Sequence, residues 1–441
     1  MPQVLWYFSA FLVTAVFLAI VFCVRFLRSQ RYLLGTKIPG PAPIPLLGNL
    51  HTFAAQTSRV LEFLKEVIGV YGPTCRFWFG THLVVAVFNP TDVQTVVSSR
   101  KMIDKPFFYK PLRKLWGCGL SSEPLVGWKK HRKIMDPAFR VKLIESFVDV
   151  FKTKSEILAD RLRSHADEQP FDVLGYALKF TIDNTTQTTL GTSVDFQTGE
   201  SSELMEDFLD MKNSVWQLVL LNKLCTFQNG RESCLMTKKE LRDQSIHVTI
   251  TAMDTSAIAL STVLMLLGLH QDVQQRVIEE QKRVLCDDRH RSVKLEELRE
   301  IVLKESLRLF PPLPIMGRRV QEAVDIEGYT LPAGSTVIIP IYLIHRDPRS
   351  FTRPEEFYPD RFHPSNCQGR HPCSFIPFST GRRDCIGKTY ASVLLKTALS
   401  IILRQFEILP CMSREQMEAV GFQVTIEMKH GYKIKLRPRL W

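Results

Sequence analysis

The sequence predicts a mainly helical protein with small β-sheets, of the α+β class, joined to an N-terminal transmembrane helix. Three observations support this prediction. Residues 4–24 are apolar and uncharged, most of the chain between 146 and 269 carries apolar residues at helical spacing, and residues 75–79 and 83–88 are short apolar and β-branched runs. The chain has 441 residues, of which 45% are hydrophobic, so it can bury a large core.

The uncharged run near the N-terminus is long enough to cross a bilayer, because a spanning helix needs about 20 apolar residues. A cleaved signal peptide would have a positively charged start, a shorter apolar core and a small-residue cleavage site, so we expect residues 1–30 to be a retained membrane anchor. Basic residues follow the run at Arg25, Arg28, Arg31 and Lys37. The positive-inside rule therefore predicts that everything downstream lies in the cytoplasm.

The elements after the anchor follow from local sequence signals. Residues 31–48 are basic and rich in proline, and we expect them to form a stiff hinge. The turn Gly80-Thr81-His82 separates the two β-branched runs and predicts a hairpin. Apolar spacing then predicts helices at 146–166, 176–190 and 202–221.

A longer helix is predicted to begin at the capping box formed by Thr237 and Glu240 and to end near Leu269, a length of ~45 Å. Asp254 and Thr255 lie in the middle of its apolar wall. One reading is structural: Thr255 bonds back to a carbonyl one turn earlier, and Asp254 pairs with a basic residue. Beyond this reading, an Asp and a Thr in the middle of an apolar helix need a reason.

Composition excludes several classes of protein. Ten cysteines occur without a C-x-x-C pair, which argues against a disulfide scaffold or a zinc ribbon and favours a reducing, cytosol-facing compartment. The formal charge of +12 is not arranged as a basic stripe with interleaved aromatic residues, so we expect no nucleic-acid partner. The excess charge indicates an anionic membrane or an acidic protein partner, or simply a solvated surface.

The most informative segment sets one cysteine in a specialised loop, residues 378–387. Gly381 and Gly387 allow tight turns and close approach of a flat ligand, Phe378 can shield the sulfur, and Arg383 can meet an anionic group. A helix predicted at 388–403 would begin just after Cys385 and lower the pKa of its thiol. A purely structural cysteine would leave the surrounding residues unexplained.

This loop, F-x-x-G-x-R-x-C-x-G, resembles the haem-binding signature of the cytochrome P-450 superfamily at all five fixed positions. The resemblance implies the P-450 fold for a haem-thiolate catalytic domain at residues 49–441, with haem b held noncovalently and Cys385 as the ligand of its iron. Residues 39–45 also resemble the proline hinge of microsomal members. Because Thr251 stands where some relatives carry a haem-esterifying glutamate, no covalent link to the porphyrin is expected.

Other motifs extend the resemblance. Trp128 and Arg132 match W-x-x-x-R, whose indole and guanidinium lie on one helix face and would hold a haem propionate. Arg383 matches a further propionate partner and Arg318 another, although surface ion pairs are the competing reading for Arg132 and Arg318. Three basic neighbours could dock an acidic electron donor or form a solvated helix face: Lys129, Lys130 and Lys133.

The resemblance assigns Asp254 and Thr255 to proton delivery toward bound dioxygen, as in the family motif [AG]-G-x-[DE]-T-[ST]. The chain departs from this motif at Ala252, where glycine is usual, and this departure implies slower or leakier oxygen activation. Three further residues resemble the E-x-x-R plus arginine motif, a buried structural triad behind the cysteine loop: Glu305, Arg308 and Arg361.

The chain is shorter than the family pattern in one region. Between 216 and 237 we expect roughly 60 residues more, for two helices that roof the substrate pocket, and a smaller gap precedes Glu305. A splice form, a gene-model error and a real lineage with an open active site all remain compatible with these gaps.

The resemblance implies a microsomal monooxygenase of the endoplasmic reticulum membrane. It would insert one oxygen atom from O2 into an apolar substrate, a fatty acid, hormone-like lipid or xenobiotic, with electrons from an NADPH-cytochrome reductase and with cytochrome b5 as a second candidate donor. Gly317-Arg318 and residues 375–379 resemble the family-4-like hydroxylases of insects. The rival readings are a haem-thiolate isomerase or peroxygenase that needs no reductase, and a non-catalytic haem-binding splice form that lacks the pocket roof.

Overall fold

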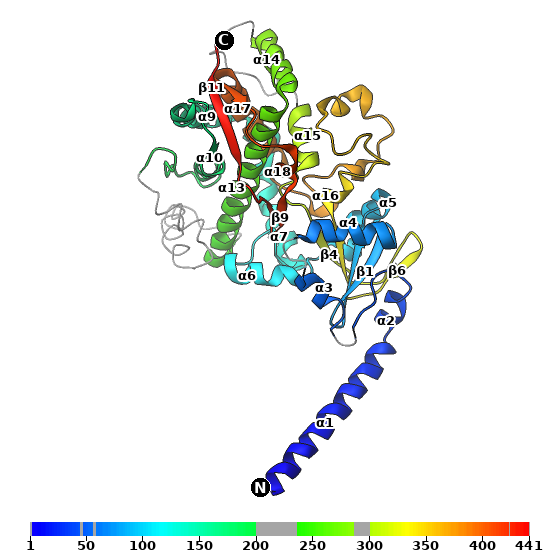
Figure 1. Cartoon of the computed structure of the whole chain (residues 1–441). Helices are drawn as coiled ribbons and strands as arrows, with labels where there is room; N and C mark the ends of the chain where they lie inside the picture. The colour runs from blue at the N-terminus through cyan, green and yellow to red at the C-terminus, as the bar shows by residue number, and fades with distance from the viewer. Residues whose placement is uncertain are drawn as a thin grey trace. The chain divides into compact units, whose positions relative to one another are not determined.

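The computed structural model describes residues 2–44, 47–55, 59–199, 236–285, 300–422 and 424–440. The fold is mainly helical with small sheets, as predicted. It divides into two compact units (Figure 1). Unit 1 comprises Met1–Phe107 and Ile315–Pro340, and unit 2 comprises Phe108–Pro314 and Ile341–Trp441.

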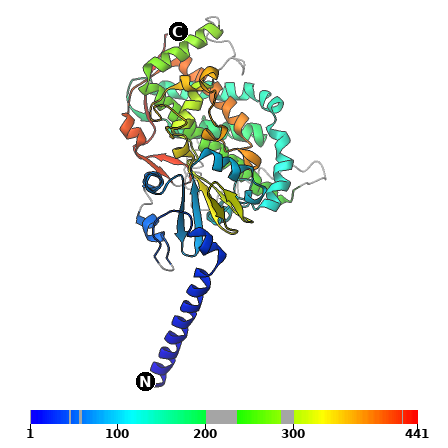
Figure 2. The same cartoon turned by 90° about the vertical axis from the view of Figure 1, so that its right-hand side faces the viewer.

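Unit 1 begins with the predicted N-terminal helix, α1 (Pro2–Leu27). Its segment Trp6–Leu27 is long and apolar enough to cross a membrane, and none of it is buried in the protein. Figures 1 and 2 show α1 leaving the rest of unit 1 as a single extended helix. An apolar helix with no protein surface to cover it needs another apolar surrounding, which a lipid bilayer provides.

The core of unit 1 is a four-stranded sheet in the order β1-β2-β7-β4. The predicted hairpin is confirmed as the antiparallel pair β1 (Thr74–Phe79) and β2 (His82–Val87), joined through Gly80 in the left-handed region. β7 (Thr336–Ile339) runs parallel to β2, and β4 (Met316–Arg319) pairs antiparallel with β7. The remaining elements of unit 1 are α2 (Gln30–Gly35), α3 (Leu50–Ala55), α4 (Val60–Tyr71), α5 (Pro90–Ser98), and the hairpin of β5 (Val324–Ile326) and β6 (Tyr329–Leu331).

Unit 2 is built around α13 (Lys238–Leu269), the predicted long helix (Figure 1). It begins at the predicted capping box, in which the Thr237 side chain accepts from the Glu240 amide and the Glu240 side chain accepts from the Thr237 amide. The helix passes through Ala252 without a break. It is also long and apolar enough to span a membrane, but most of it is buried inside the protein, as befits a core helix.

Helices from distant parts of the chain surround α13. It packs against α10 (Leu174–Thr189), α14 (Gln271–Leu285), α15 (Ile301–Leu309) and α17 (Lys388–Gln405). The predicted helix at 146–166 is α9 (Val148–Leu162) with a following 3-10 turn, and it packs on α10 and α17. The other helices of unit 2 are α6 (Lys110–Trp116), α7 (Leu125–Met135), α8 (Val141–Glu145), α16 (Ile341–Ile344) and α18 (Arg414–Glu418).

Two small sheets complete unit 2. One has the order β3-β11-β8, with β3 (Phe171–Asp172), β11 (Lys433–Pro438) and β8 (Phe406–Leu409) all antiparallel. The other is the hairpin of β9 (Val420–Phe422) and β10 (Ile426–Met428). The predicted helix at 202–221, most of the shortened segment 216–237, and the junction at 286–299 lie outside the described residues.

Candidate functional site

The cysteine loop is closed by its own backbone. The amide of Cys385 donates to the carbonyl oxygen of Phe378 at 2.9 Å. Between them, Ser379 and Gly381 both have positive φ, +59° and +79°, and a 3-10 turn spans Gly381–Arg383. Glycine adopts this region of φ without the strain that a side chain brings, so Gly381 is required by backbone geometry as the sequence suggested. The loop delivers Cys385 to the start of α17, whose N-cap is Gly387.

The pKa of the Cys385 thiol differs from the prediction. Cys385 is exposed to solvent, but the surrounding protein still desolvates its thiol, and this desolvation raises the pKa. A hydrogen bond from the Gly387 backbone and the charges of Arg132 and Lys388 act in the predicted direction, but they are smaller. The expectation of a lowered pKa is therefore wrong for the protein alone, because desolvation outweighs the helix terminus. A desolvated thiolate needs a partner of positive charge, and a metal ion is such a partner.

Space lies beside the sulfur. A methyl group built on Gly387 would meet only the Cys385 Sγ, at an ordinary contact distance of 3.9 Å. Gly387 has a φ of −86°, which any residue adopts. Glycine therefore contributes open space beside the sulfur at this position, and its backbone freedom is not required. An exposed sulfur with adjoining open space suits a flat ligand whose metal takes sulfur as a ligand.

Trp128 and Arg383 meet beside the loop. The guanidinium carbon of Arg383 lies 5.0 Å from the centre of the Trp128 ring, which is a cation–π contact. Both side chains are buried. Nη2 of Arg383 also donates to the main-chain oxygens of Glu123 and Leu120, so the segment before α7 anchors this cation.

Arg132 joins α7 to the residue before the cysteine. Its Nη1 donates to the Asp384 carbonyl at 2.8 Å, its Nη2 lies 3.0 Å from Asp384 Oδ1, and its Nε contacts Asp136 Oδ1. The guanidinium is partly exposed. Trp128, Arg132, Arg383 and Cys385 thus come together as the sequence suggested, and their positive charge and indole suit an anionic flat macrocycle.

A buried polar network lies next to these residues, and no sequence motif predicted it. His131 Nδ1 lies 2.8 Å and 2.9 Å from the two carboxylate oxygens of Glu123. Gln244 of α13 donates to Glu123 at 3.4 Å, and His131 Nε2 lies 3.2 Å from Glu240, whose pKa is lowered to about 2 by its hydrogen bond from Lys130 and by the Thr237 cap.

Asp254 and Thr255 both point to partners inside the protein. The Thr255 hydroxyl donates to the carbonyl of Thr251 at 2.6 Å, which is the back bond of the structural reading. Oδ2 of Asp254 accepts from the Thr425 hydroxyl at 2.8 Å, so its partner is a hydroxyl and not the basic residue of that reading. Burial raises the pKa of Asp254, and the hydrogen bond from Thr425 opposes this increase.

Glu305, Arg308 and Arg361 form a closely bonded cluster in unit 2. Nε and Nη2 of Arg308 each lie 2.8 Å from a different oxygen of Glu305, and Arg361 Nε lies 2.9 Å from Glu305 Oε1. All three side chains are buried. The two arginines also donate to main-chain oxygens of five residues: His345, Thr352, Arg353, Pro354 and Glu356.

His345 links this cluster to the chain that leads to the cysteine loop. Its Nε2 accepts from the Ile376 amide at 2.9 Å, and its Nδ1 lies 3.3 Å from the Arg308 carbonyl. The side chain is completely buried, and this burial lowers the pKa of His345 to about 3, with Arg308 and Arg346 adding to the effect. The sequence does not single out His345, since a histidine in a loop carries no positional signal.

Arg318, the second suggested propionate partner, lies on β4 of unit 1. Its side chain is buried, and Nη1 donates to the Gly317 carbonyl at 3.1 Å. Its relation to the residues of unit 2 stays a prediction.

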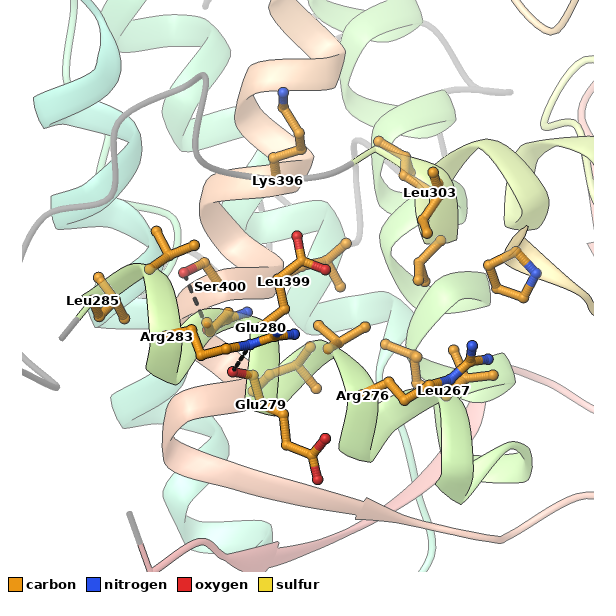
Figure 3. A pocket seen from close by; sticks show the side chains of 18 of the residues that line it. Leu267, Arg276, Glu279, Glu280, Arg283, Leu285, Leu303, Lys396, Leu399 and Ser400 are labelled. Atoms are coloured by element: carbon orange, nitrogen blue, oxygen red, sulfur yellow. Dashed lines mark hydrogen bonds between the residues drawn. The ribbon is translucent and has the colours of Figure 1, made fainter. Parts of the chain in front are cut away.

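A cavity of about 340 Å³ lies elsewhere in unit 2 (Figure 3). It is lined by α14, α15 and α17, with Arg276, Glu279 and Arg283 on one side and Lys396, Leu399 and Ser400 on another. Residues of the cysteine loop are not among those that line it. Its lining includes Leu285 and Ile301, close to the two ends of a gap in the described residues, and we assign it no role.

Comparison with known proteins gives the same family as the motifs. The family model described as Cytochrome P450 matches residues 38–233 and 212–435. Cytochrome P450 4c3 of Drosophila melanogaster is 30% identical, over 91% of this chain and 89% of the relative. Cytochrome P450 4V2 of Mus musculus is 30% identical, over 83% of this chain and 82% of the relative. Cytochrome P450 4d2 of Drosophila melanogaster is also 30% identical, over 91% and 94%. The chain therefore belongs to the cytochrome P450 family, and within it is similar to family 4 members.

Proposed function

We propose that this haem-thiolate monooxygenase inserts one oxygen atom from O2 into an apolar small molecule, with electrons from NADPH delivered by a flavoprotein reductase. The observation that carries the proposal is the presentation of the Cys385 sulfur. It is exposed beside open space at the start of α17, next to the cluster of Trp128, Arg132 and Arg383. The substrate class is a fatty acid, a hormone-like lipid or a xenobiotic.

The proposed cofactor is haem b, held noncovalently apart from the bond between Cys385 and iron. Gly381 sets the turn and Gly387 leaves room for the porphyrin face, while Phe378 fixes the loop through its carbonyl. Arg383, Trp128 and Arg132 would bind the propionates, and Arg318 is a further candidate. When bound, the haem would supply oxygen activation, and the thiolate would favour cleavage of the O–O bond.

Asp254 and Thr255 are the proposed proton-delivery pair. A half-buried carboxyl whose pKa is raised by desolvation keeps its proton to higher pH than an exposed one, which suits a general acid. Thr255 lies one residue further along α13, and its hydroxyl would turn from the Thr251 carbonyl toward the substrate side during turnover. Glu305, Arg308 and Arg361 would hold the core behind the cysteine loop through their buried ion pairs.

Electron delivery is proposed to use the face of α7 that carries exposed Lys129 and Lys133. Lys130 on the same helix is paired with Glu240 at 2.8 Å and contributes less free charge. An NADPH-cytochrome reductase with an acidic surface fits these cations, and cytochrome b5 is a second candidate. Steered association of this kind weakens as salt is added.

The proposed location is the endoplasmic reticulum membrane, with α1 as a single span and the catalytic part in the cytoplasm. The absence of burial along α1 supports the span, and the basic residues Arg25 and Arg28 at its end support the orientation. The burial of α13 supports its role as a core helix instead of a second span.

The test is the reduced carbon monoxide difference spectrum of the full-length chain in microsomes, followed by product analysis with lauric acid. A long-wavelength Soret band and hydroxylated product that requires both NADPH and reductase are expected. A thiolate-type band with product formed only from peroxide would favour a peroxygenase. The absence of any thiolate-type band would contradict haem-thiolate function in this chain.

A further inference from the structure

Asp254 is bonded to a residue 171 positions away in the chain. The hydroxyl of Thr425 donates to Asp254 Oδ2 at 2.8 Å. Among the described residues, no other side chain is hydrogen-bonded to this carboxylate. Because Asp254 lies on the core helix α13 and Thr425 lies immediately before β10 in the β9–β10 hairpin, the bond ties two separate elements of unit 2 together.

The Thr425 hydroxyl is held in place by the backbone that follows it. The amide of Ile426 donates to the Pro312 carbonyl at 2.9 Å, and the Ile426 carbonyl accepts from the Tyr432 hydroxyl at 3.2 Å. Ile426 also pairs with Phe422 across the hairpin. Both main-chain polar groups of Ile426 are therefore engaged, and they hold the backbone next to Thr425 in place.

Thr425 also lies at the boundary between the acid and solvent. It is partly exposed, and its neighbour Val424 has an exposed fraction of 38%, whereas Ile426 is buried. The Asp254 carboxyl is surrounded by enough protein that desolvation raises its pKa. Tyr432 is the other titratable group that interacts electrostatically with Asp254 in the described structure, but its hydroxyl is buried and directed to Ile426.

Thr255, although next to Asp254 in the chain, does not donate a hydrogen bond to its carboxylate as Thr425 does. Its hydroxyl is turned along α13 to the Thr251 carbonyl, so the acid and the adjacent alcohol are not bonded to each other. The structure therefore offers Asp254 a hydroxyl from the hairpin, while the Thr255 hydroxyl is bonded within α13.

We propose that Thr425 positions Asp254 and carries protons to it from solvent. The proposal rests on the proposed role of Asp254 as a general acid. A hydroxyl donates one hydrogen bond while accepting others, so it can pass a proton without changing its own charge. In each transfer the Thr425 O–H bond breaks as a new O–H bond forms on Asp254 Oδ2, and the Thr425 oxygen takes a replacement proton from a solvent water that is in turn reprotonated by buffer. No electrons change hands.

The first test measures Asp254 directly in the purified full-length protein. The infrared carbonyl band of the protonated acid is followed against pH and is identified by its loss in D254N. Removal of the Thr425 hydroxyl in T425V should raise the pKa of Asp254 by about one unit, because the carboxylate loses its hydrogen bond. T425S, which keeps the hydroxyl, should restore the original titration. Identical titrations in wild type and T425V would overturn the positioning role.

The second test measures delivery. With NADPH, reductase and lauric acid, T425V should release several-fold more hydrogen peroxide per NADPH and show a larger solvent deuterium isotope effect than wild type, and T425S should behave like wild type. The matched control is T153V, which removes an exposed helical hydroxyl bonded to the Asp149 carbonyl. Unchanged peroxide release in T425V beside a strong effect in D254N would overturn the relay alone. A D254N enzyme as well coupled as wild type would overturn the proposed role of Asp254 and the relay with it.

Discussion

Nη2 of Arg383 donates a hydrogen bond to the main-chain oxygen of Glu123. Arg383 lies two residues before Cys385, and the side chain of Glu123 is a buried carboxylate. The same guanidinium lies over the Trp128 ring. Glu123 therefore acts twice: its backbone holds the cation of the cysteine loop, and its side chain holds His131 of α7. This arrangement fixes α7 against the loop without using the sulfur itself.

Replacement of Cys385 by alanine should abolish thiolate ligation of haem, because its loop and the start of α17 present this sulfur in the described structure. We expect the long-wavelength Soret band of the reduced carbon monoxide complex to be lost while the far-ultraviolet circular dichroism is unchanged. C411A is the matched control, since Cys411 is also a free and partly exposed cysteine. An unchanged thiolate-type spectrum in C385A would refute the assignment.

Local signals in the sequence predicted much of this fold and part of the site. The start of α13 was predicted from its capping box, and the hairpin of β1 and β2 from β-branched runs around Gly80. Such signals work because caps and turns are decided by residues within a few positions of each other. Sequence motifs also predicted that Trp128 and Arg383 belong to the same site as the cysteine loop.

The rest depends on contacts between distant positions. Glu123 and Gln244 are 121 positions apart, and Asp254 and Thr425 are 171 apart, so no periodicity could connect them. The predicted pKa of Cys385 failed for a related reason. A helix N-terminus is visible in the sequence, but the number of protein atoms packed around a sulfur is decided only by the tertiary structure, and here desolvation is the larger effect.

Gly127→Ala should destabilise the protein through the Glu123–His131 contact. A methyl group on Gly127 would overlap Oε1 and Cδ of Glu123, so the buried carboxylate that bonds to His131 would have to shift. We expect the free energy of unfolding to fall by about 1–3 kcal/mol in urea titrations. Gly175→Ala is the control: this helical glycine has nothing within 4 Å of its added methyl, and the change should be neutral or stabilising by up to ~1 kcal/mol. Equal effects of the two substitutions would contradict the steric argument.

Glu305→Gln should destabilise the protein strongly, because two buried guanidinium groups lose their shared carboxylate charge. Breaking a buried ion pair by removing one charge costs about 3–5 kcal/mol. The measurement is the free energy of unfolding in urea, with haem release as a second readout. Glu156→Gln is the control, since Glu156 pairs with Lys152 at 4.0 Å on the exposed face of α9 and such pairs contribute about 0–1 kcal/mol. Comparable losses in both variants would argue against a structural role for the triad.

Thr255→Ala should leave haem binding intact and divert electrons to hydrogen peroxide. The hydroxyl that is removed bonds only to the Thr251 carbonyl within α13 in the described structure, so the fold loses little. Peroxide released per NADPH should rise severalfold, measured beside the carbon monoxide spectrum to confirm that haem content is unchanged. Thr262→Ala offers a comparison, because its hydroxyl makes the same kind of back bond, to Ile258, deeper in the buried part of the helix. Tight coupling in the Thr255 variant would count against proton delivery.

His345 should make the protein less stable as the pH falls below about 6.5, the ordinary histidine pKa. Burial lowers its pKa in the folded protein to about 3, so between these values the unfolded chain binds a proton that the folded protein does not. The free energy of unfolding must then fall with falling pH, by up to about 1.4 kcal/mol per pH unit from this group.

His345→Gln keeps an acceptor for the Ile376 amide and a donor for the Arg308 carbonyl but cannot take up this proton. Urea unfolding at pH 7 and pH 5 should show that the variant loses about 2 kcal/mol less than wild type over this interval. His363→Gln, at an exposed histidine bonded to Ser365, should leave the pH dependence as in wild type. If His345→Gln and wild type lose the same stability between the two pH values, the imidazole takes up its proton in the folded protein as well. A protonated imidazole cannot accept at Nε2, so the hydrogen bond from the Ile376 amide could not then hold the chain that leads to Cys385.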